Sequence, residues 1–274
     1  MLNKVYTHKG VFHADEVSAI ALLKVFYNDK IDVERVPHQQ DFTGIRNGEV
    51  FIIDIGGLYE PETYSFDHHQ FRPEDQVLSS AGMILLWLRT AGFIPTELYQ
   101  ILRKDYISDI DLNDIGLKKS EPNELSSIVS CYNLDKPNSY EQDNAFEDAV
   151  SMVMRVFSSV KRRYESDVKA KEKILSLKHS DGIMYSEEFV PGWNKALAGN
   201  NIGVEIFAWF DNETGEYKAQ NVPLEVGSFD AIGRKIMYNK SDVKDDVVFV
   251  HKGNFFIVTK TKEALLKYLE NNLK

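Results

Sequence analysis

The sequence predicts an α/β protein with a larger N-terminal domain built on a mainly parallel sheet, a long connecting helix and a smaller mixed α/β C-terminal domain. In the first part of the chain, short apolar runs alternate with helical patterns, which is typical of strands joined by covering helices. One long helical pattern follows, and after it strand patterns return with turn residues between them. We place the three parts at residues 1–135, 136–180 and 181–274.

The composition narrows the class of protein. With 43% hydrophobic and 27% charged residues among 274, the chain has the make-up of a soluble globular protein. No run approaches the ~20 apolar residues of a membrane span, and the N-terminal residues carry no signal-peptide core. The lone cysteine, Cys131, excludes an internal disulfide and fits a reducing compartment. We therefore expect a cytoplasmic protein without a membrane partner, and no pattern indicates its oligomeric state.

The net charge of −10 restricts the substrate. A protein that binds duplexes regardless of sequence needs clustered cations, and this charge balance argues against such binding. A nucleotide or a short single strand held at a metal site is compatible with it, because the ions supply the local positive charge.

Residues 4–8 predict the first strand, and a helical pattern over residues 17–26 makes the segment between them a strand-to-helix loop. His8, His13 and Asp15 therefore gather at the carboxyl end of this strand. Acidic residues at a helix start also satisfy free N–H groups and the helix dipole, which is the simpler interpretation of Asp15 and the glutamate after it. That interpretation does not account for two histidines in the same loop.

The next strands lead to a carboxylate. Residues 31–38 predict a second strand, with the alternation of an edge strand. Residues 50–53 are apolar throughout, which suits a strand buried on both faces, and the run stops at Asp54 before a Gly-Gly turn. Ligands of open α/β sheets bind beyond the carboxyl ends of the strands, so Asp54 lies where chemistry is expected.

Asp67, His68 and His69 stand in a row behind Phe66. Carboxylate and imidazole are ligands suited to Mn, Zn or Fe(II) rather than to a calcium cage. Taken alone, each such piece is better explained as a capped turn or a pair of exposed histidines. Three pieces at one sheet edge favour a metal site.

Two later segments add candidates. Ser79 and Ser80 precede an apolar helical run, which is an ordinary N-cap signal. A helix N-terminus that points into the crevice also holds phosphate oxygens, so Ser80 is a candidate for substrate binding. Acidic residues crowd into 104–116, and the apolar residues between them predict that at least one carboxylate points inward. Asp111 and Asp114 are the candidates for a further metal ligand.

The remaining elements follow from periodicity and turn residues. The long helical pattern runs over residues 145–179, and the excess of positive charge in its second half indicates a solvated face. Further helices are expected at residues 95–103, 229–237 and 262–273, a hairpin with a four-residue loop from strands 203–210 and 216–222, and more strands at 247–251 and 255–258.

The metal-ligand candidates come from separate loops at one sheet edge. Two nearby divalent ions that share Asp54 as a bridge would use that many ligands, and such a pair drives in-line hydrolysis of phosphoesters. A single ion would leave several ligands idle. The candidates are His8, His13, Asp15, Asp54, His68 and one of Asp111 and Asp114.

Four motifs occur together: His-Ala-Asp-Glu at residues 13–16, Asp-Ile-Gly-Gly at 54–57, Phe-Asp-His-His-Gln at 66–70 and Ser-Ser-Ala-Gly at 79–82. In combination they resemble the melanocyte-proliferating-gene-one (MYG) family, which belongs with the DHH phosphoesterases. Residues 217–223, 227–229 and 248–251 also have counterparts in that family, so the resemblance covers nearly the whole chain.

The resemblance implies a Rossmann-like DHH domain, a second domain that binds substrate, and a manganese-type two-metal phosphodiesterase. Members of the family are described as 3′-to-5′ RNA exonucleases. By position, His8, His13 and Asp15 match the first metal motif, Asp54 the bridging carboxylate, and His68 the metal-binding histidine of the triplet. His69 would face the scissile phosphate, and Asp67 would orient its neighbours.

The sequence departs from the family pattern in three places. His13 stands where the superfamily has an aspartate, with an extra residue in the motif, and the added nitrogen favours Mn over Mg. Asp114 is followed by Ile where the family has Asn. Many members of the superfamily carry a Gly-Gly-Gly-His segment near the C-terminus. This sequence lacks it, and His251 is the nearest equivalent of its histidine. The substrate-binding candidates of the second domain are Gln220 and His251 from the resemblance, and Arg234 and Lys252 from their charge.

Three functions remain open from the sequence. The first is a two-metal 3′–5′ exonuclease on RNA or short oligonucleotides. The second is the same chemistry on a small substrate, such as a dinucleotide, a nucleoside bisphosphate or pyrophosphate. The third is a non-catalytic nucleotide-binding protein, against which a full ligand set argues, because buried carboxylates without metal are costly.

Overall fold

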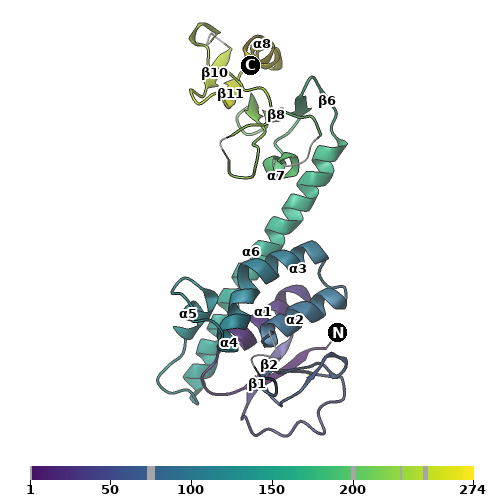
Figure 1. Cartoon of the computed structure of the whole chain (residues 1–274), viewed down its shortest axis with the longest axis vertical. Coiled ribbons are helices and arrows are strands. Elements are labelled where there is room, and N and C mark those ends of the chain that lie inside the picture. The colour runs from purple at the N-terminus through teal and green to yellow at the C-terminus, as the bar shows by residue number, and fades with distance from the viewer. Residues whose placement is uncertain (1, 73–77, 199–201, 229, 243–245) are drawn as a thin grey trace. The chain divides into compact units, whose positions relative to one another are not determined.

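The computed structural model describes residues 2–72, 78–198, 202–228, 230–242 and 246–274. The chain forms two compact units, Met1–Arg162 and Arg163–Lys274, and the division falls inside one long helix (Figure 1). Among the described residues, no helix is both long enough and apolar enough to cross a bilayer.

The first unit is built on a five-stranded sheet in the order β2-β1-β3-β5-β4. All neighbours pair in parallel except β4 and β5, so the sheet is mainly parallel, as predicted, and β2 is an edge strand. Its central strand β3 is completely buried, in agreement with its unbroken apolar sequence. The strands are β1 (Lys4–His8), β2 (Asp32–Val36), β3 (Phe51–Ile53), β4 (Tyr59–Glu60) and β5 (Ser65–Phe66).

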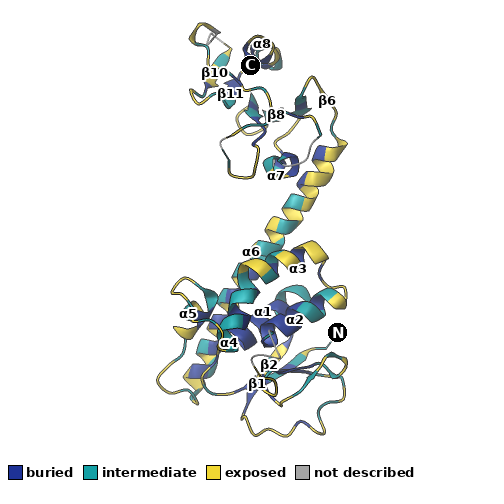
Figure 2. Ribbon diagram, in the orientation of Figure 1, coloured by how far each residue is buried: buried dark blue, intermediate teal, exposed yellow. Residues whose placement is uncertain are grey.

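Helix α1 is the innermost helix of this unit. Its residues 14–23 are all buried, and it packs against α2 (Figure 2). A helix that is apolar on all sides belongs in a core, which explains why α1 lacks an amphipathic stripe. The helices of the unit are α1 (Ala14–Phe26), α2 (Ser80–Thr90), α3 (Thr96–Leu102), α4 (Ser108–Asp114) and α5 (Leu125–Ser130), with a 3₁₀ turn η1 (Pro61–Thr63) and a π-helical turn η2 (Arg103–Ile107) between α3 and α4.

The predicted long helix is α6 (Tyr140–Ser176), a single helix of 37 residues. It begins at Tyr140, five residues before the start that the sequence pattern predicted. The hydroxyl of Ser139 accepts a hydrogen bond from the backbone N–H of Gln142 at 3.2 Å, which caps the earlier start.

The second unit contains a six-stranded sheet in the order β10-β11-β9-β8-β7-β6, antiparallel except for β7 with β8. The predicted hairpin is confirmed: Asp211 pairs with Glu216 across the loop of residues 212–215. The sheet has two buried faces, one in contact with α7 and the end of α6 and the other with α8. The elements are β6 (His179–Ser180), β7 (Ile183–Ser186), α7 (Trp193–Leu197), β8 (Ile206–Asp211), β9 (Glu216–Asn221), η3 (Lys240–Asp242), β10 (Val247–Val250), β11 (Phe256–Thr259) and α8 (Lys262–Asn272).

The helix expected over residues 229–237 is not formed in residues 230–237, and Phe229 lies outside the described residues. The backbone there is held by a side chain from β9. Asn221 donates to the carbonyl of Arg234 at 2.7 Å and accepts from the N–H of Ile236 at 3.1 Å. These bonds replace the intrahelical bonds that a helix would need.

Candidate metal centre

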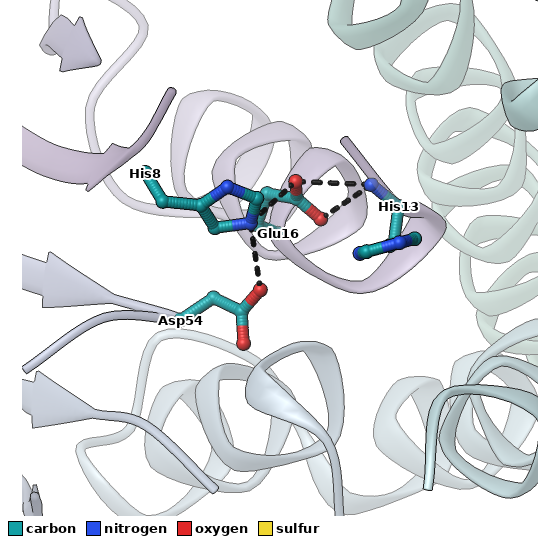
Figure 3. A group of neighbouring side chains, drawn as sticks. All are labelled: His8, His13, Glu16 and Asp54. Carbon is teal, nitrogen blue, oxygen red and sulfur yellow. Dashed lines mark hydrogen bonds and ion pairs between the residues drawn. The ribbon is translucent and has the colours of Figure 1, made fainter. Parts of the chain in front are cut away.

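The carboxyl ends of two neighbouring parallel strands bring the first candidate ligands together. His8 is the last residue of β1, and Asp54 follows β3 directly. The Nε2 atom of His8 lies 3.2 Å from Oδ2 of Asp54 and 3.2 Å from Oε1 of Glu16 (Figure 3). Asp54 has a left-handed backbone with φ of 57°, an uncommon conformation for a residue with a side chain. Such strained residues cluster at functional sites.

The start of α1 supplies the next ligands. His13 is the N-cap residue, and its backbone N–H donates to both carboxylate oxygens of Glu16 at 3.0 Å. Glu16 and Asp15 are both fully buried. Asp15 accepts a hydrogen bond from the hydroxyl of Ser80 at 2.5 Å. The acidic pair therefore starts the helix and also faces the site, so the two interpretations of these residues are compatible.

The Asp-His-His triplet closes the site from the side of β5. Nε2 of His68 lies 2.8 Å from Oδ2 of Asp114, 3.3 Å from Oδ1 of Asp54 and 3.9 Å from Oδ2 of Asp15. Nδ1 of His69 lies 2.7 Å from Oδ1 of Asp67, and the His69 side chain is 62% exposed. His68 thus contacts three carboxylates, whereas its neighbour faces solvent.

Asp67 is itself fixed by backbone donors. Its Oδ2 accepts from the N–H of Gly57 at 2.6 Å, and its Oδ1 accepts from the N–H of His69 at 3.0 Å. Burial raises the pKa of Asp67, but its bonds to His69 and to these N–H groups outweigh burial and lower it. Asp67 is a charged acceptor that orients the His69 ring.

Three sets of side chains have ligand atoms within 4.8 Å of one another, and each set contains a histidine. Asp54 belongs to two of the sets, which is the placement expected of a bridging ligand, and His13 also belongs to two. The sets are His8, His13, Glu16 and Asp54; Asp54, His68 and His69; and His13, Asp15 and Asp114.

The polar atoms of this cluster fit divalent cations. Among the described residues, Oδ1 of Asp15, Oδ1 of Asp54 and Oδ2 of Asp114 are buried and accept no well-directed hydrogen bond, and Nε2 of His68 is the group that lies close to the last two, at 3.3 and 2.8 Å. Carboxylate oxygens in that condition are costly unless a cation compensates them. Imidazole and carboxylate together form a donor set that suits Mn, Fe or Zn.

The pKa values report the same excess of negative charge. Burial lowers the pKa of His8, but its bonds to Asp54 and Glu16 outweigh burial and raise it to about 10. Burial also lowers the pKa of His68. Its bonds to Asp114 and Asp54 outweigh burial and raise this pKa to about 10 as well. Protons on these rings balance carboxylates that a bound cation would neutralise instead, so metal binding would release protons here.

Burial of the Asp15 carboxyl and the negative charges of its neighbours both raise the pKa of Asp15. Desolvation is the first cause, and the negative charges of Asp54 and Asp114 add to it. These three carboxylates repel one another in the metal-free protein, and cations between them would remove the repulsion.

Of the two candidates on α4, Asp114 lies in the cluster and Asp111 does not. Asp111 is buried, as one acidic residue of this segment was expected to be, and accepts from the N–H of Ser79 at 3.0 Å and from its hydroxyl at 2.7 Å. It also pairs with Arg103 of the π-helical turn. A Cβ on Gly82 would lie 2.6 Å from the Asp111 oxygens, so this glycine is required for the close approach of α2 to α4. Asp111 therefore joins helices.

The prediction that Ser80 binds substrate has to be corrected. Ser80 is fully buried, and its hydroxyl is committed to Asp15. It follows Ser79, which is the N-cap of α2 by backbone conformation but gives its side chain to Asp111. Both serines thus connect α2 to acidic residues of neighbouring helices.

Two residues near the cluster were not among the predicted ligands. Glu16 was interpreted as a helix-start residue alone, because its position gives that signal first. His38 follows β2, and its ring stacks on that of His8 with centroids 4.7 Å apart and planes inclined by 21°. Since β2 pairs in parallel with β1, the ends of these strands had to lie side by side, and this adjacency is the signal that would have found His38.

A buried network fixes the loop that carries His8 and His13. Nε of Arg35 donates to the carbonyl of His8 at 3.1 Å, Nη2 donates to that of Gly10 at 2.9 Å, and Nη1 pairs with Asp143 of α6 at 2.8 Å. The guanidinium lies 4.6 Å from the centroid of the Phe146 ring. Arg35 therefore joins the loop to α6.

Two amides complete this network. The side chain of Asn133 accepts from the N–H of Phe12 at 3.0 Å and donates to its carbonyl at 2.8 Å. Gln142 donates to Asn133 at 2.6 Å and to the carbonyl of Gly10 at 3.1 Å. The backbone of the loop between His8 and His13 thus has specific hydrogen-bond partners from distant parts of the chain.

The candidates in the second unit have other surroundings. Arg234 pairs with Glu205 at 2.6 Å and with Asp181 at 3.2 Å, so its charge is already balanced. Nδ1 of His251 accepts from the N–H of Gly253 at 2.9 Å, which leaves Nε2 for a ligand. Gln220 lines a cavity of about 210 Å³, and Lys252 is exposed.

Comparisons with known proteins agree with the motifs. The family model MYG1_exonuc, described as an uncharacterised protein family (UPF0160), matches residues 4–273. The MYG1 protein of Chlamydia pneumoniae is 32% identical over 163 residues, which cover 59% of this chain and 55% of that protein. The match thus spans little more than half of the chlamydial relative. The MYG1 exonuclease of Homo sapiens is 23% identical over 320 residues, covering 96% of this chain and 84% of the human protein.

Among solved structures, RecJ of Thermus thermophilus in complex with Mg²⁺ is similar at 11% identity and a TM-score of 0.27, covering 98% of this chain and 48% of RecJ. The family match takes in nearly every residue from β1 to α8. By that match, this chain belongs to the MYG1_exonuc family.

Proposed function

We propose that this protein is a metal-dependent phosphoesterase that removes nucleotides from the 3′ end of RNA or short oligonucleotides. The observation that carries the proposal is the set of three buried carboxylate oxygens on Asp15, Asp54 and Asp114, which lie among histidines at one sheet edge, the last two within 3.3 Å of Nε2 of His68. The name of the human relative, MYG1 exonuclease, supports a nucleic acid as substrate.

Two divalent ions would fit the cluster, and Asp54, which belongs to two of the ligand sets, would be the ligand they share. When bound, such ions activate a water molecule and stabilise the attacking and leaving oxygens of a phosphoester. Mn²⁺ suits the site better than Mg²⁺, because imidazoles contribute to each ligand set. The residues that would hold the ions are His8, His13, Asp15, Glu16, Asp54, His68 and Asp114.

His69 is the residue assigned to the scissile phosphate. Its bond to Asp67 is the main cause that raises its pKa, and it fixes the ring by Nδ1. Nε2 is then left to donate to a phosphate oxygen, and a charged donor is the stronger one. Asp67 acts through His69, as a positioning residue. In the second unit, we assign Gln220 and His251 to substrate contacts away from the metals.

Hydrolysis of a 5′-labelled RNA ladder in Mn²⁺, run beside a dinucleotide and pyrophosphate, tests this function. We expect successive shortening of the RNA from its 3′ end, and loss of all activity in Asp54→Asn. An enzyme that cleaves the dinucleotide or pyrophosphate but leaves the ladder intact would instead be a small-substrate hydrolase. Absence of hydrolysis of every phosphoester would refute the enzymatic proposal.

A further inference from the structure

We propose that a pocket beside the metal centre binds one nucleobase of the substrate and the phosphate that follows it. This inference rests on the proposed function and specifies its substrate class. The pocket has a volume of about 270 Å³. It lies between the turn His68–Arg72 and the end of α4 at Asp114–Gly116, all within the first unit.

Both walls of the pocket also supply the metal centre. His68 and His69 come from one wall, and Asp114 comes from the other. A phosphoester with its phosphate at the centre therefore has its substituent in this pocket or next to it. A volume just under the range of about 300–1,000 Å³ typical of small-molecule sites suits a single nucleotide residue.

The side chain for a base is Phe71. Its N–H donates to the carbonyl of His68 at 3.0 Å, so a turn places this residue beside the histidines, with which it lines the pocket. Phe71 is 40% exposed, a large share for an aromatic ring, and the half-buried Ile115 lines the same pocket. Aromatic rings bind bases by stacking without regard to sequence, which is what an exonuclease needs.

The side chain for a phosphate is Arg72. The centre is rich in carboxylates, and an anionic substrate needs positive charge at its entrance. Arg72 is the arginine among the residues that line the pocket, beside the two histidines of the metal centre. A guanidinium binds phosphate by two parallel hydrogen bonds. Because Arg72 follows Phe71 directly in the chain, the two side chains would contact a base and its neighbouring phosphate together. Pyrophosphate, which has no base, would make no use of Phe71.

Binding measured without turnover tests the pocket. Titration calorimetry in Mn²⁺ would compare AMP with inorganic phosphate for wild type, Phe71→Ala and Phe71→Trp. We expect Phe71→Ala to weaken AMP binding about 5- to 150-fold, the range of base stacking on an aromatic ring, with phosphate binding unchanged. Phe71→Trp should restore AMP binding. For Arg72→Gln, the probe is a trinucleotide with hydrolysis-resistant phosphorothioate linkages, whose affinity should fall further than that of AMP.

Two matched variants lie just outside the pocket. Leu117 is 58% exposed and Lys119 is exposed, and neither lines the pocket. Leu117→Ala and Lys119→Gln should bind all three probes as wild type does. The pocket is refuted if wild type binds no AMP. It is also refuted if Phe71→Ala leaves the affinity for AMP unchanged or lowers the affinity for phosphate by the same factor, or if the matched variants lower the affinities as much as the pocket variants do. A protein with Phe71-dependent AMP binding but no hydrolysis would refute the exonuclease and keep the pocket.

Discussion

The hydroxyl of Ser80 donates a 2.5 Å hydrogen bond to Oδ2 of Asp15, and both residues are fully buried. The bond fixes one carboxylate oxygen, and the other, Oδ1, has no hydrogen-bond partner among the described residues. The first turn of α2 therefore sets the direction in which Asp15 presents its free oxygen to a cation.

Replacement of Ser80 by Ala should lower metal affinity. Partners of metal ligands typically contribute about 10–100-fold in affinity, and we expect a loss in that range for one Mn²⁺ equivalent. Titration calorimetry measures it. Ser79→Ala is the matched variant, since Ser79 bonds Asp111 outside the cluster. It should lower the free energy of unfolding by about 1–3 kcal/mol and leave Mn²⁺ affinity unchanged. Equal affinities in the two variants would contradict the role of Ser80.

Asp54→Asn should abolish activity and weaken both ions. Asparagine tolerates a left-handed backbone, so the φ of 57° at this position adds no new strain. The variant removes the negative charge and keeps the shape. Metal content after gel filtration in Mn²⁺ gives the stoichiometry, and a variant that still holds two equivalents would show that Asp54 does not bridge.

His69→Ala should lose rate and keep metal. A positioned acid or base contributes roughly 10²–10⁴-fold, and the ring of His69 is largely exposed, so its removal leaves little cavity. The measurements are kcat on an oligonucleotide and Mn²⁺ content of the same preparation. His69 also has a ligand atom near Asp54 and His68, so loss of one metal equivalent would make it a ligand instead.

The choice of metal should follow the nitrogen content of the site. We expect higher kcat/KM in Mn²⁺ than in Mg²⁺, because Mg²⁺ prefers oxygen ligands. His13→Asp exchanges an imidazole for a carboxylate and should shift the ratio of the two rates toward Mg²⁺. Faster turnover of wild type in Mg²⁺, or a ratio unchanged in the variant, would disprove this assignment.

Arg35→Met should destabilise the first unit more than Asp143→Asn does. The first variant leaves the carbonyl of His8 without its Arg35 donor and the carbonyl of Gly10 with Gln142 alone, at a cost of about 1–3 kcal/mol. The second removes a partner with a side chain 37% exposed, which costs about 0.2–1 kcal/mol. Urea unfolding of both variants gives the difference. Equal midpoints would mean that the ion pair alone matters.

Strong local signals predicted most of the fold. The apolar run of β3, the hairpin β8–β9 and the length of α6 depend on patterns within their own residues, and the structure contains all three. The segment 230–237 was wrongly predicted as a helix, because the Asn221 side chain that holds it comes from another strand. A tertiary hydrogen bond of this kind leaves no mark in the local pattern.

The site shows the same division. The positions of His8, Asp54 and His68 near strand ends predicted from sequence that they lie together, since parallel strands end at a common edge. In the structure Asp54 has ligand atoms near both histidines. The choice between Asp111 and Asp114 was beyond the sequence, because they lie three positions apart on one helix, and positions three apart share a face. The contacts of Asp111 with Ser79 and Arg103, outside the cluster, favour Asp114 as the ligand.

The network around Arg35 also sets an order of events during synthesis. The loop of residues 9–13 emerges early, yet the amides that bond it belong to Asn133 and Gln142. A ribosome must add more than a hundred further residues before those partners exist, although every candidate ligand is in place once Asp114 has been made. A nascent chain that ends before residue 133 therefore carries the full ligand set on a loop that lacks its bonds to Asn133 and Gln142. We therefore expect a metal ion to be captured only after α6 has been made.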